Sequence, residues 1–322
     1  MSSARPRPVY FDCDTGVDDS VALALLLASP EIALVGIGTV SGNVDSTQAA
    51  RNTLDLLALA ARDDVPVAVG AHDHLSHAHD GGVPHIHGHN GVGDVVLPTS
   101  PIEPDPRTAV QLLLDLSHAH SGELVVVTVG PLTNLALALR ADPTLPERVA
   151  SVVTMGGAAL VPGNITAVAE ANIYNDAEAA AEVAEASWPL TLVPLDVTLE
   201  HRLDEDDRTA LLASGLPLAR AIGDILDLYF DFYVGLYGTR SCALHDPLAA
   251  AIAIGLVTPS VAPAVPLVVD AGDGPGRGQT IADLRAPRTG YIDHPGVTTR
   301  IVLDTDRALA PVLIERLTTP RA

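Results

Sequence analysis

Short apolar runs rich in valine, isoleucine and leucine alternate along the chain with stretches in which apolar residues recur at helical spacing. The apolar runs lie at residues 8–12, 33–40, 65–70, 123–130, 149–157 and 190–197. Helical spacing is clearest at residues 18–29 and 46–62. Continuous apolar strands that alternate with helices are typical of a mostly parallel sheet covered on both faces. We therefore predict an α/β fold with a Rossmann-like open sheet, in one domain over residues 1–322 because no repeat or linker interrupts the chain.

Two segments depart from this alternation. Residues 72–106 are rich in histidine, glycine and proline, which predicts a long irregular loop over one edge of the ligand-binding face. Residues 203–240 have the pattern of a mostly helical insertion. No apolar run reaches the roughly 18 uncharged residues of a membrane span, and the opening "MSSARPRP" lacks the apolar stretch of a signal peptide. We expect a cytoplasmic protein.

The charge balance narrows the range of partners. The chain has 40 acidic and 18 basic residues, a formal net charge of −22, which disfavours nucleic acid and anionic membranes. All the basic residues are arginines, so Schiff-base, pyridoxal phosphate and P-loop lysine chemistry are excluded. Cys13 and Cys242 show no CxxC spacing and suit a reducing compartment, so we expect no structural disulfide.

Polar side chains follow several of the predicted strands. They are Asp12, Asp14, Asp18 and Asp19 after the first strand, Asn43 after the second and Asn164 after the fifth. In parallel α/β sheets, ligands bind beyond the carboxyl ends of the strands. These carboxylates and amides should therefore meet at one edge of the sheet.

Aspartates spaced like Asp14 and Asp19 can offer several oxygens to one hard cation, Ca²⁺ or Mg²⁺. Capping of the following helix by Asp18 or Asp19 is the simpler explanation for one of them, but it does not explain four. Zinc fits less well, because the cluster has no histidine or cysteine ligands at the usual spacing. A cation here would lower the pKa of a bound water, and Asp14 could take its proton, which indicates hydrolysis. The neighbouring amide-rich segments suit a polyhydroxylated ligand such as a sugar.

These residues resemble the calcium-dependent nucleoside hydrolases, the inosine-uridine preferring or ribonucleoside hydrolases, over nearly the whole chain. The most specific element is "DCDTGVDD", which is similar to the DxDPGxDD of that family. It is followed in order by "SGNV", "VGPLTNLALAL", "MGGA", "GNITAVAEAN", "DAEAA", "PLDVT", "LHDPLA" and "RGQTIADLR". The resemblance implies hydrolysis of the N-glycosidic bond of ribonucleosides to free base and ribose, in nucleoside catabolism and salvage.

The resemblance also implies roles for single residues. Calcium would be bound by the side chains of Asp14, Asp19 and Asp246 and by the main-chain carbonyl of Val129. Asp14 would also be the general base on the calcium-bound water. The ribose hydroxyls would contact Asp18, Asn43, Asn164, Glu170 and Asn172, with Met155 packing nearby. Such contacts favour an oxocarbenium-like transition state over the bound substrate.

Residues on the side of the leaving base are implied in the same way. His245, directly before Asp246, would protonate the departing base or bond to it. Tyr229, Tyr233 and Tyr237 fall at i, i+4 and i+8, which makes one stripe on a helix. Such a stripe is usually core, but by resemblance Tyr233 and Tyr237 would face the base. His87, in the "HG" of the loop, would approach the substrate.

Seven of the 12 histidines lie between His72 and His89. This composition is typical of a transition-metal trap, but we expect a solvated lid with incidental metal affinity. Two departures from the family pattern stand near the site, Thr15 for the usual proline and Ala171 for the usual aromatic. The second removes bulk close to the expected base pocket, so the preference for purine or pyrimidine stays open. The family commonly forms homodimers or homotetramers, and we expect one of these.

Two alternatives remain at this point. "DCDTGV" also resembles the DxDxT opening of haloacid-dehalogenase-type phosphatases, in which Asp12 would attack a phosphoryl group. That reading lacks the usual lysine and leaves Asp18, Asp19 and the "HDP" segment unexplained. A catalytically silent nucleoside- or ribose-binding protein is the non-enzymatic alternative, and the retained Asp14 disfavours it.

Overall fold

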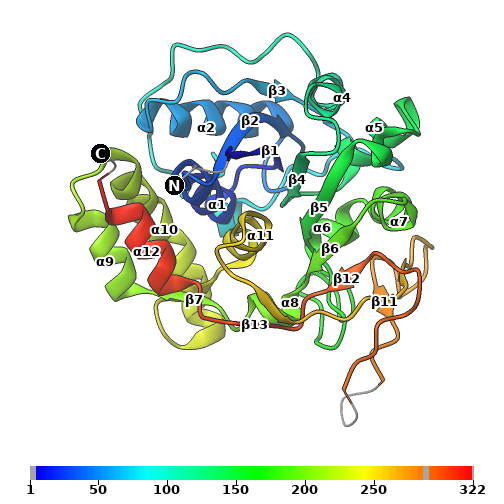
Figure 1. Cartoon of the computed structure of the whole chain (residues 1–322). Coiled ribbons are helices and arrows are strands. Elements are labelled where there is room, and N and C mark those ends of the chain that lie inside the picture. The colour runs from blue at the N-terminus through cyan, green and yellow to red at the C-terminus, as the bar shows by residue number, and fades with distance from the viewer. Residues whose placement is uncertain (1–4, 286–289, 321–322) are drawn as a thin grey trace.

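A seven-stranded sheet organises the computed structural model, which describes residues 5–285 and 290–320 (Figure 1). The strand order is β12-β6-β5-β4-β1-β2-β3, and every pair of neighbours is parallel. The strands of this sheet are β1 (Arg7–Cys13), β2 (Ile32–Thr39), β3 (Val67–Val69), β4 (Leu124–Thr128), β5 (Val149–Met155), β6 (Leu190–Val193) and β12 (Arg300–Ile301). The prediction of a mostly parallel, Rossmann-like sheet in a single α/β domain is confirmed. The first four residues of the opening "MSSARPRP" lie outside the described part.

Helices cover both faces of the sheet. The helices of the described residues are α1 (Val17–Leu27), α2 (Ser46–Leu59), α3 (Pro84–His87), α4 (Ala109–Ala119), α5 (Thr133–Ala141), the 3₁₀ helix η1 (Leu145–Glu147), α6 (Ala171–Asn175), α7 (Ala177–Glu185), α8 (Leu195–Thr198), α9 (Glu205–Ala213), α10 (Pro217–Tyr237), α11 (His245–Ile254) and α12 (Ala310–Thr318). Three short antiparallel pairs lie outside the main sheet, namely β7 (Arg202–Asp204) with β8 (Ser241–Ala243), β9 (Pro259–Val261) with β13 (Asp304–Thr305) and β10 (Leu267–Val269) with β11 (Thr280–Ala282).

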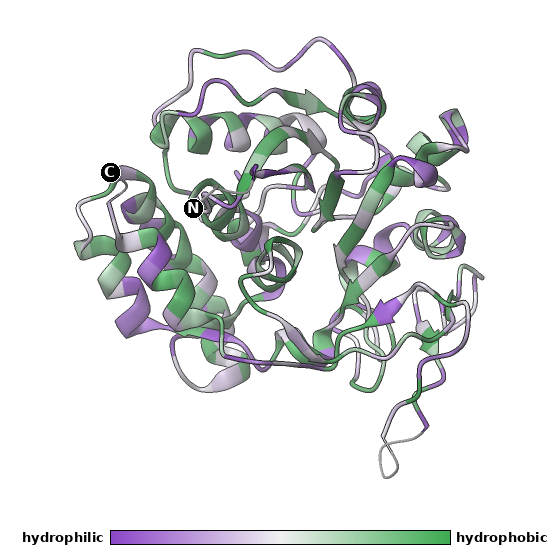
Figure 2. Cartoon of the chain, in the orientation of Figure 1, coloured by the Kyte–Doolittle hydropathy of each residue, from purple (hydrophilic) through white to green (hydrophobic). Residues whose placement is uncertain are grey.

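Alternation along β1 explains the two layers. Phe11 and Cys13 belong to a buried cluster that takes in apolar side chains of α1, α2, α10, α11 and α12. Tyr10 points to the other face, where it packs with side chains of α4, α5 and α7. Figure 2 shows the central strands mostly in green and the outer helices in alternating green and purple. The sheet is therefore buried on both faces, which explains the continuous apolar strands.

The strand order reverses between β1 and β4. From β1 the chain continues outward through β2 and β3 on one side, whereas β4 continues through β5 and β6 on the other. Connections that diverge in this way leave a crevice beyond the carboxyl ends of the two strands. The N–H of Val129 donates to the carbonyl of Asp12 at 2.9 Å and closes the strand pair at this point. The fold thus places the end of β1 beside the end of β4.

The helical insertion predicted for residues 203–240 is confirmed as α9 and α10. Arg240 binds Glu205 of α9 at 2.8 Å and Asp227 of α10 at 2.7 Å, and it also pairs with Asp231. Arg208 adds a contact to Asp227 at 2.9 Å. These ion pairs join the two helices on their half-exposed side, while the apolar face of α10 packs against the core.

The histidine-rich segment is mostly irregular, as predicted, but it contains the short helix α3. Two contacts fasten it to the end of the sheet. The N–H of Val83 donates to the carbonyl of Asn43 at 3.1 Å. The Asn52 amide donates to the carbonyl of Asn90 in the loop at 2.8 Å and to that of Thr15, just after β1, at 3.1 Å. The loop therefore lies over the end of β1, as a lid would.

Two further expectations can be compared with the structure. Cys13 and Cys242 are both free and buried. Within the part of the chain that the structure describes, none of the helices has both the length and the apolar character of a membrane span.

Gly38 on β2 gives a test of this packing. A Cβ at Gly38 would collide with the Tyr10 hydroxyl and would stand 2.7 Å from an oxygen of Asp12. We predict that Gly38→Ala lowers the free energy of unfolding by about 1–3 kcal/mol, because the side chains must shift in a well-packed interior. Urea denaturation checks this. Gly235→Ala is the control, since a Cβ there meets no described atom within 4 Å and should stabilise α10 by about 0.5–1 kcal/mol. Equal unfolding midpoints for Gly38→Ala and the unmodified protein would contradict the packing.

Candidate functional site

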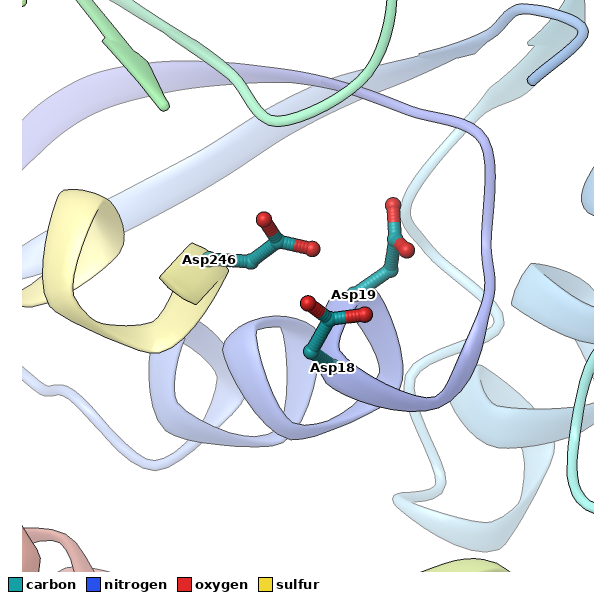
Figure 3. A group of neighbouring side chains, drawn as sticks. All are labelled: Asp18, Asp19 and Asp246. Atoms are coloured by element: carbon teal, nitrogen blue, oxygen red, sulfur yellow. The ribbon is translucent and has the colours of Figure 1, made fainter. Parts of the chain in front are cut away.

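Three buried carboxylates converge beyond the end of β1. Asp18 and Asp19 lie in the first turn of α1, and Asp246 lies in the first turn of α11. One oxygen from each lies within 4.8 Å of the others, and Figure 3 shows the three side chains turned toward a common space. Two helix N-termini meet here, and their dipoles favour negative charge. The site therefore gathers acidic groups from two segments that lie far apart in the sequence.

Asp19 is held in place by the turn that enters α1. It accepts hydrogen bonds from the N–H of Asp14 at 3.1 Å and of Gly16 at 2.9 Å, and from the Asn43 amide at 3.1 Å. The bond from Gly16 is one half of a capping box at the start of the helix. Of the two aspartates expected to cap α1, Asp19 is the one that does so.

Asp14 lies next to Asp19 and has one bonded and one unbonded oxygen. Its Oδ2 accepts from the N–H of Asn43 at 2.6 Å. Its Oδ1 and the Oδ1 of Asp18 are shielded from solvent and have no hydrogen-bond partner among the described residues. A Cβ at Gly130 would stand 2.8 Å from that Asp14 oxygen, so the chain must be glycine there. Buried carboxylate oxygens without partners are costly, which points to a ligand.

Burial raises the pKa of each carboxyl in this group. The pKa of Asp14 lies well above its usual range because of burial and the nearby charge of Asp19. Burial and Asp19 raise the pKa of Asp18 to about 7, and burial with the neighbouring carboxylates raises that of Asp246 strongly. These groups cannot all ionise without a compensating positive charge. A donor set made only of oxygens fits a hard cation such as Ca²⁺.

Val129 follows β4 directly and faces the same crevice. Its carbonyl accepts from the Asn172 amide at 2.8 Å, and a carbonyl oxygen retains a second lone pair for another partner. The same amide lies 3.4 Å from the sulfur of Met155, which is buried. The ends of β4 and β5 and the start of α6 thus meet at one point, as the sequence predicted.

Glu170 and Asn164 hold the segment that leads into α6. The Glu170 carboxylate accepts from the N–H groups of Gly157 at 2.9 Å, Asn172 at 2.9 Å and Ile173 at 3.2 Å. The Asn164 side chain is exposed and accepts from the N–H of Ala171 at 3.0 Å. Both side chains are engaged by backbone groups here, so their predicted contacts to ribose stay predictions.

His245 opens α11 directly before Asp246 and is buried. Its Nδ1 lies 2.7 Å from the hydroxyl of Thr198. Burial lowers the pKa of His245 to about 4, so the ring is neutral at pH 7. A neutral imidazole still offers one N–H donor and one acceptor. It can therefore bond to a leaving group without carrying a positive charge itself.

An aromatic ladder runs along α10 above the site. The ring centres of Tyr229 and Tyr233 are 4.9 Å apart, and those of Tyr233 and Tyr237 are 5.2 Å apart in a stacked arrangement. His87 lies at the inner end, 5.3 Å from the Tyr229 ring, and accepts from the N–H of Val17 at 3.1 Å. Burial lowers the pKa of His87 to about 3.

Tyr229 is the member of the ladder nearest to the acidic cluster, although the sequence did not single it out as a site residue. Its side chain interacts with Asp18 and lowers the pKa of that carboxyl against the larger effect of burial. The only signal for its place in the sequence was the i, i+4 spacing, which puts Tyr229 on the same face of the helix as Tyr233.

Asp12 supports the site from below. Its carboxylate accepts from the Tyr10 hydroxyl at 3.1 Å and from the Asn134 amide at 3.0 Å. The same amide donates to the carbonyl of Thr39 at 2.9 Å, so Asn134 ties β1 to β2 beneath the cluster. Burial raises the pKa of Asp12 to about 7. The sequence included Asn134 in "VGPLTN" but did not predict this role.

Asp14→Asn tests whether the unbonded oxygen serves a cation. Asparagine can still accept the bond from the Asn43 N–H, but it removes one buried negative charge. We predict that calcium raises the melting temperature of the unmodified protein and not that of Asp14→Asn, while the calcium-free variant melts no lower than the calcium-free parent. Thermal unfolding with and without Ca²⁺ measures both. Asp64→Asn, at an exposed ion pair, should keep the full calcium effect, and an undiminished effect in Asp14→Asn would contradict a role in binding.

Comparison with known proteins gives a consistent result. The profile of the family described as inosine-uridine preferring nucleoside hydrolase matches residues 9–310. The "Probable uridine nucleosidase 2" of Arabidopsis thaliana is 36% identical over 248 residues, 77% of each chain. The plant nucleoside hydrolase PpNRh1 has a TM-score of 0.90 at 30% identity, covering 98% of this chain and 100% of that one. The purine-preferring ribonucleoside hydrolase of Gardnerella vaginalis has a TM-score of 0.87 at 33% identity, covering 97% of both.

Proposed function

This chain belongs to the inosine-uridine preferring nucleoside hydrolases and hydrolyses ribonucleosides, and we propose that the reaction depends on calcium and on Asp14 as general base. The observation that carries the proposal is the pair of buried carboxylate oxygens, on Asp14 and Asp18, that have no hydrogen-bond partner among the described residues. The Asp14 oxygen suits a cation and its bound water, and the Asp18 oxygen suits a hydroxyl of the sugar.

The cation would be held by the carboxylates of Asp14, Asp19 and Asp246 and by the carbonyl of Val129. Asp19 and Asp246 already converge, and Asp14 adjoins Asp19. A bound Ca²⁺ would lower the pKa of a water at this position. Asp14 Oδ1 would take the proton of that water, because its Oδ2 is occupied by the Asn43 N–H and Oδ1 is free of protein partners in the described chain.

Asp18 would bind a ribose hydroxyl rather than the cation. Its carboxylate lies next to the lid and α10, with His87 Nδ1 at 3.9 Å and the Tyr229 side chain beside it. The other proposed ribose contacts are Asn43, Asn164, Glu170, Asn172 and Met155. Cleavage of the N-glycosidic bond develops positive charge on the sugar, so nearby carboxylates favour the transition state over the bound substrate.

The base would leave on the side of His245 and the aromatic ladder. His245 is neutral, so we propose that it donates a hydrogen bond to the departing base rather than acting as a cationic acid. Tyr233, Tyr237 and His87 are the further residues proposed to contact the base. Tyr233 is only 9% exposed, so a base that reaches it would be shielded from water.

Similar proteins differ in the base for which they are named. One relative is named for uridine and one structural neighbour for purines. Ala171 begins α6 in place of the usual aromatic, and we propose that the missing ring makes space for the larger bicyclic base of a purine. We propose that the enzyme accepts purine ribosides as well as uridine.

The two alternatives are not favoured. The Asp12 carboxylate lies on the face of β1 that packs against α4 and is engaged by Tyr10 and Asn134, so a phosphoryl group cannot reach it as a haloacid-dehalogenase mechanism requires. A binding protein without turnover is disfavoured by the family match over residues 9–310 and by relatives named for hydrolysis.

Three finer expectations remain proposals. We propose one nucleoside hydrolase domain over residues 1–322. We also propose a cytoplasmic location, since the two cysteines are free and buried, which suits a reducing compartment. We also propose a homodimer or homotetramer. Exposed apolar side chains support an interface, since Val268 and Ile281 face each other across β10 and β11 and are 59% and 47% exposed.

A substrate panel tests the proposed reaction. Inosine, adenosine, guanosine, uridine and cytidine are incubated with the protein, and free base and reducing sugar are measured. We expect equal amounts of base and ribose, loss of turnover after chelation with EDTA, and recovery on adding Ca²⁺. Full turnover in the presence of chelator would contradict the calcium dependence, and phosphate release from phosphoesters would support the phosphatase instead.

A further inference from the structure

The lid contains a cluster of four histidine side chains that the proposed reaction does not use. The rings of His74 and His77 have centres 4.8 Å apart, those of His72 and His79 are 5.8 Å apart, and those of His74 and His79 are 6.1 Å apart. All four come from one stretch of eight positions, residues 72–79, at the root of the lid. The fold therefore brings the rings into one group, rather than leaving them scattered in solvent.

Part of this cluster is buried without hydrogen-bond partners. His74 is only 8% exposed, and its Nδ1 has no partner among the described residues. Both ring nitrogens of His79 are likewise shielded and unpaired within the described chain. A buried polar atom without a partner costs free energy and calls for a ligand. The acidic site shows the same condition at Asp14 and Asp18.

The surroundings favour a cation. Asp176, at the start of α7, lies near His74 and accepts from the N–H of Leu75 at 2.9 Å. Asp45, Asp73 and Asp80 lie close enough to His79 for their charges to raise its pKa against the larger effect of burial. Burial keeps the rings of His74 and His79 uncharged by lowering their pKa values, and an uncharged imidazole is the form that binds metals.

We propose that His72, His74, His77 and His79 form a second metal site, for Zn²⁺ or a similar transition-metal ion. Two imidazoles bound to one tetrahedral zinc through nitrogens at 2.0–2.1 Å would have ring centres about 5 Å apart. The rings of His74 and His77 already have this spacing at 4.8 Å, whereas His79 lies 5.8–6.1 Å from its two neighbours and must move closer. Imidazole ligands select such ions over Ca²⁺, which prefers oxygen. The site is separate from the carboxylate cluster in both its residues and its ligand chemistry.

Binding requires a small rearrangement. Among the described residues, the donor atoms that already converge as a set of three are those of Asp18, Asp19 and Asp246. The histidine rings are gathered, but their nitrogens do not yet face one point. His72 has a side chain 62% exposed and His77 is exposed as well, so both can rotate toward His74 and His79 without disturbing the core.

An ion at this place would fasten the root of the lid. Leu75 is bonded to the start of α7 through Asp176, and Val83, farther along the lid, is bonded to Asn43 beside the acidic site. Cross-linking residues 72–79 would limit the motion of the segment between these two points. The inference does not rest on the proposed hydrolytic mechanism, because its test measures metal binding directly.

The chain supplies its own matched control for this test. The tetrapeptide Ser-His-Ala-His occurs at residues 76–79 in the lid and again at residues 117–120, at the end of α4. The full chain, saturated with Ca²⁺ so that the carboxylate site is filled, is titrated with Co²⁺ and then with Zn²⁺. We expect one Co²⁺ per chain with the visible spectrum of a tetrahedral nitrogen-bound ion, displaced by Zn²⁺.

Variants decide where the ion is bound. His77→Ala with His79→Ala should abolish the tetrahedral spectrum, and His118→Ala with His120→Ala should leave it unchanged. His72→Ala, at an exposed ring, should by itself weaken the tetrahedral spectrum. Melting temperatures of the calcium-loaded variants show that each variant is folded. A missing tetrahedral spectrum in the unmodified protein, or an unchanged spectrum in the His77 and His79 double variant, would overturn the proposal.

Discussion

The structure depends on keeping several carboxylates close together in a place that water hardly reaches. Asp14, Asp18, Asp19 and Asp246 are at most 8% exposed. Their mutual repulsion and desolvation oppose folding unless a positive charge or protons compensate. The fold reduces this cost with backbone N–H donors to Asp19, two helix N-termini and the amide of Asn43. Among the described residues, Oδ1 of Asp14 and Oδ1 of Asp18 still have no hydrogen-bond partner. These two oxygens are where we propose that the cation with its water and the sugar hydroxyl bind.

The position of this cluster follows from sheet topology. Because the strand order reverses between β1 and β4, the crevice opens where Asp14 directly follows β1 and Val129 directly follows β4. Beneath it, Tyr10, Asp12 and Asn134 form a buried polar layer that ties β1, β2 and α5 together. Above it, the lid and α10 bring neutral histidines and tyrosines. Carboxylates thus lie on one side of the crevice and uncharged aromatic side chains on the other. This arrangement suits a substrate whose sugar gains positive charge while its base departs.

Much of this could be predicted from the sequence, because local patterns carry it. Apolar runs marked the strands, and Asp14, Asp19 and Asn43 followed strand ends that a parallel sheet must bring together. Asn134 could not be predicted as a partner of Asp12, because 122 residues separate the two side chains and only their packing shows the contact. Burial of His74 depends likewise on distant packing against the start of α7, so the sequence predicted a solvated lid.

We propose that Asp14, Asp19, Asp246 and the carbonyl of Val129 share one calcium ion, while Asp18 is left for the sugar. Anomalous X-ray diffraction from crystals grown with Ca²⁺ measures this most directly. We expect a single strong calcium peak bound by those four groups, with Asp18 outside its ligand shell. A peak bound by Asp18 in place of Asp14, or no peak in this crevice, would contradict it.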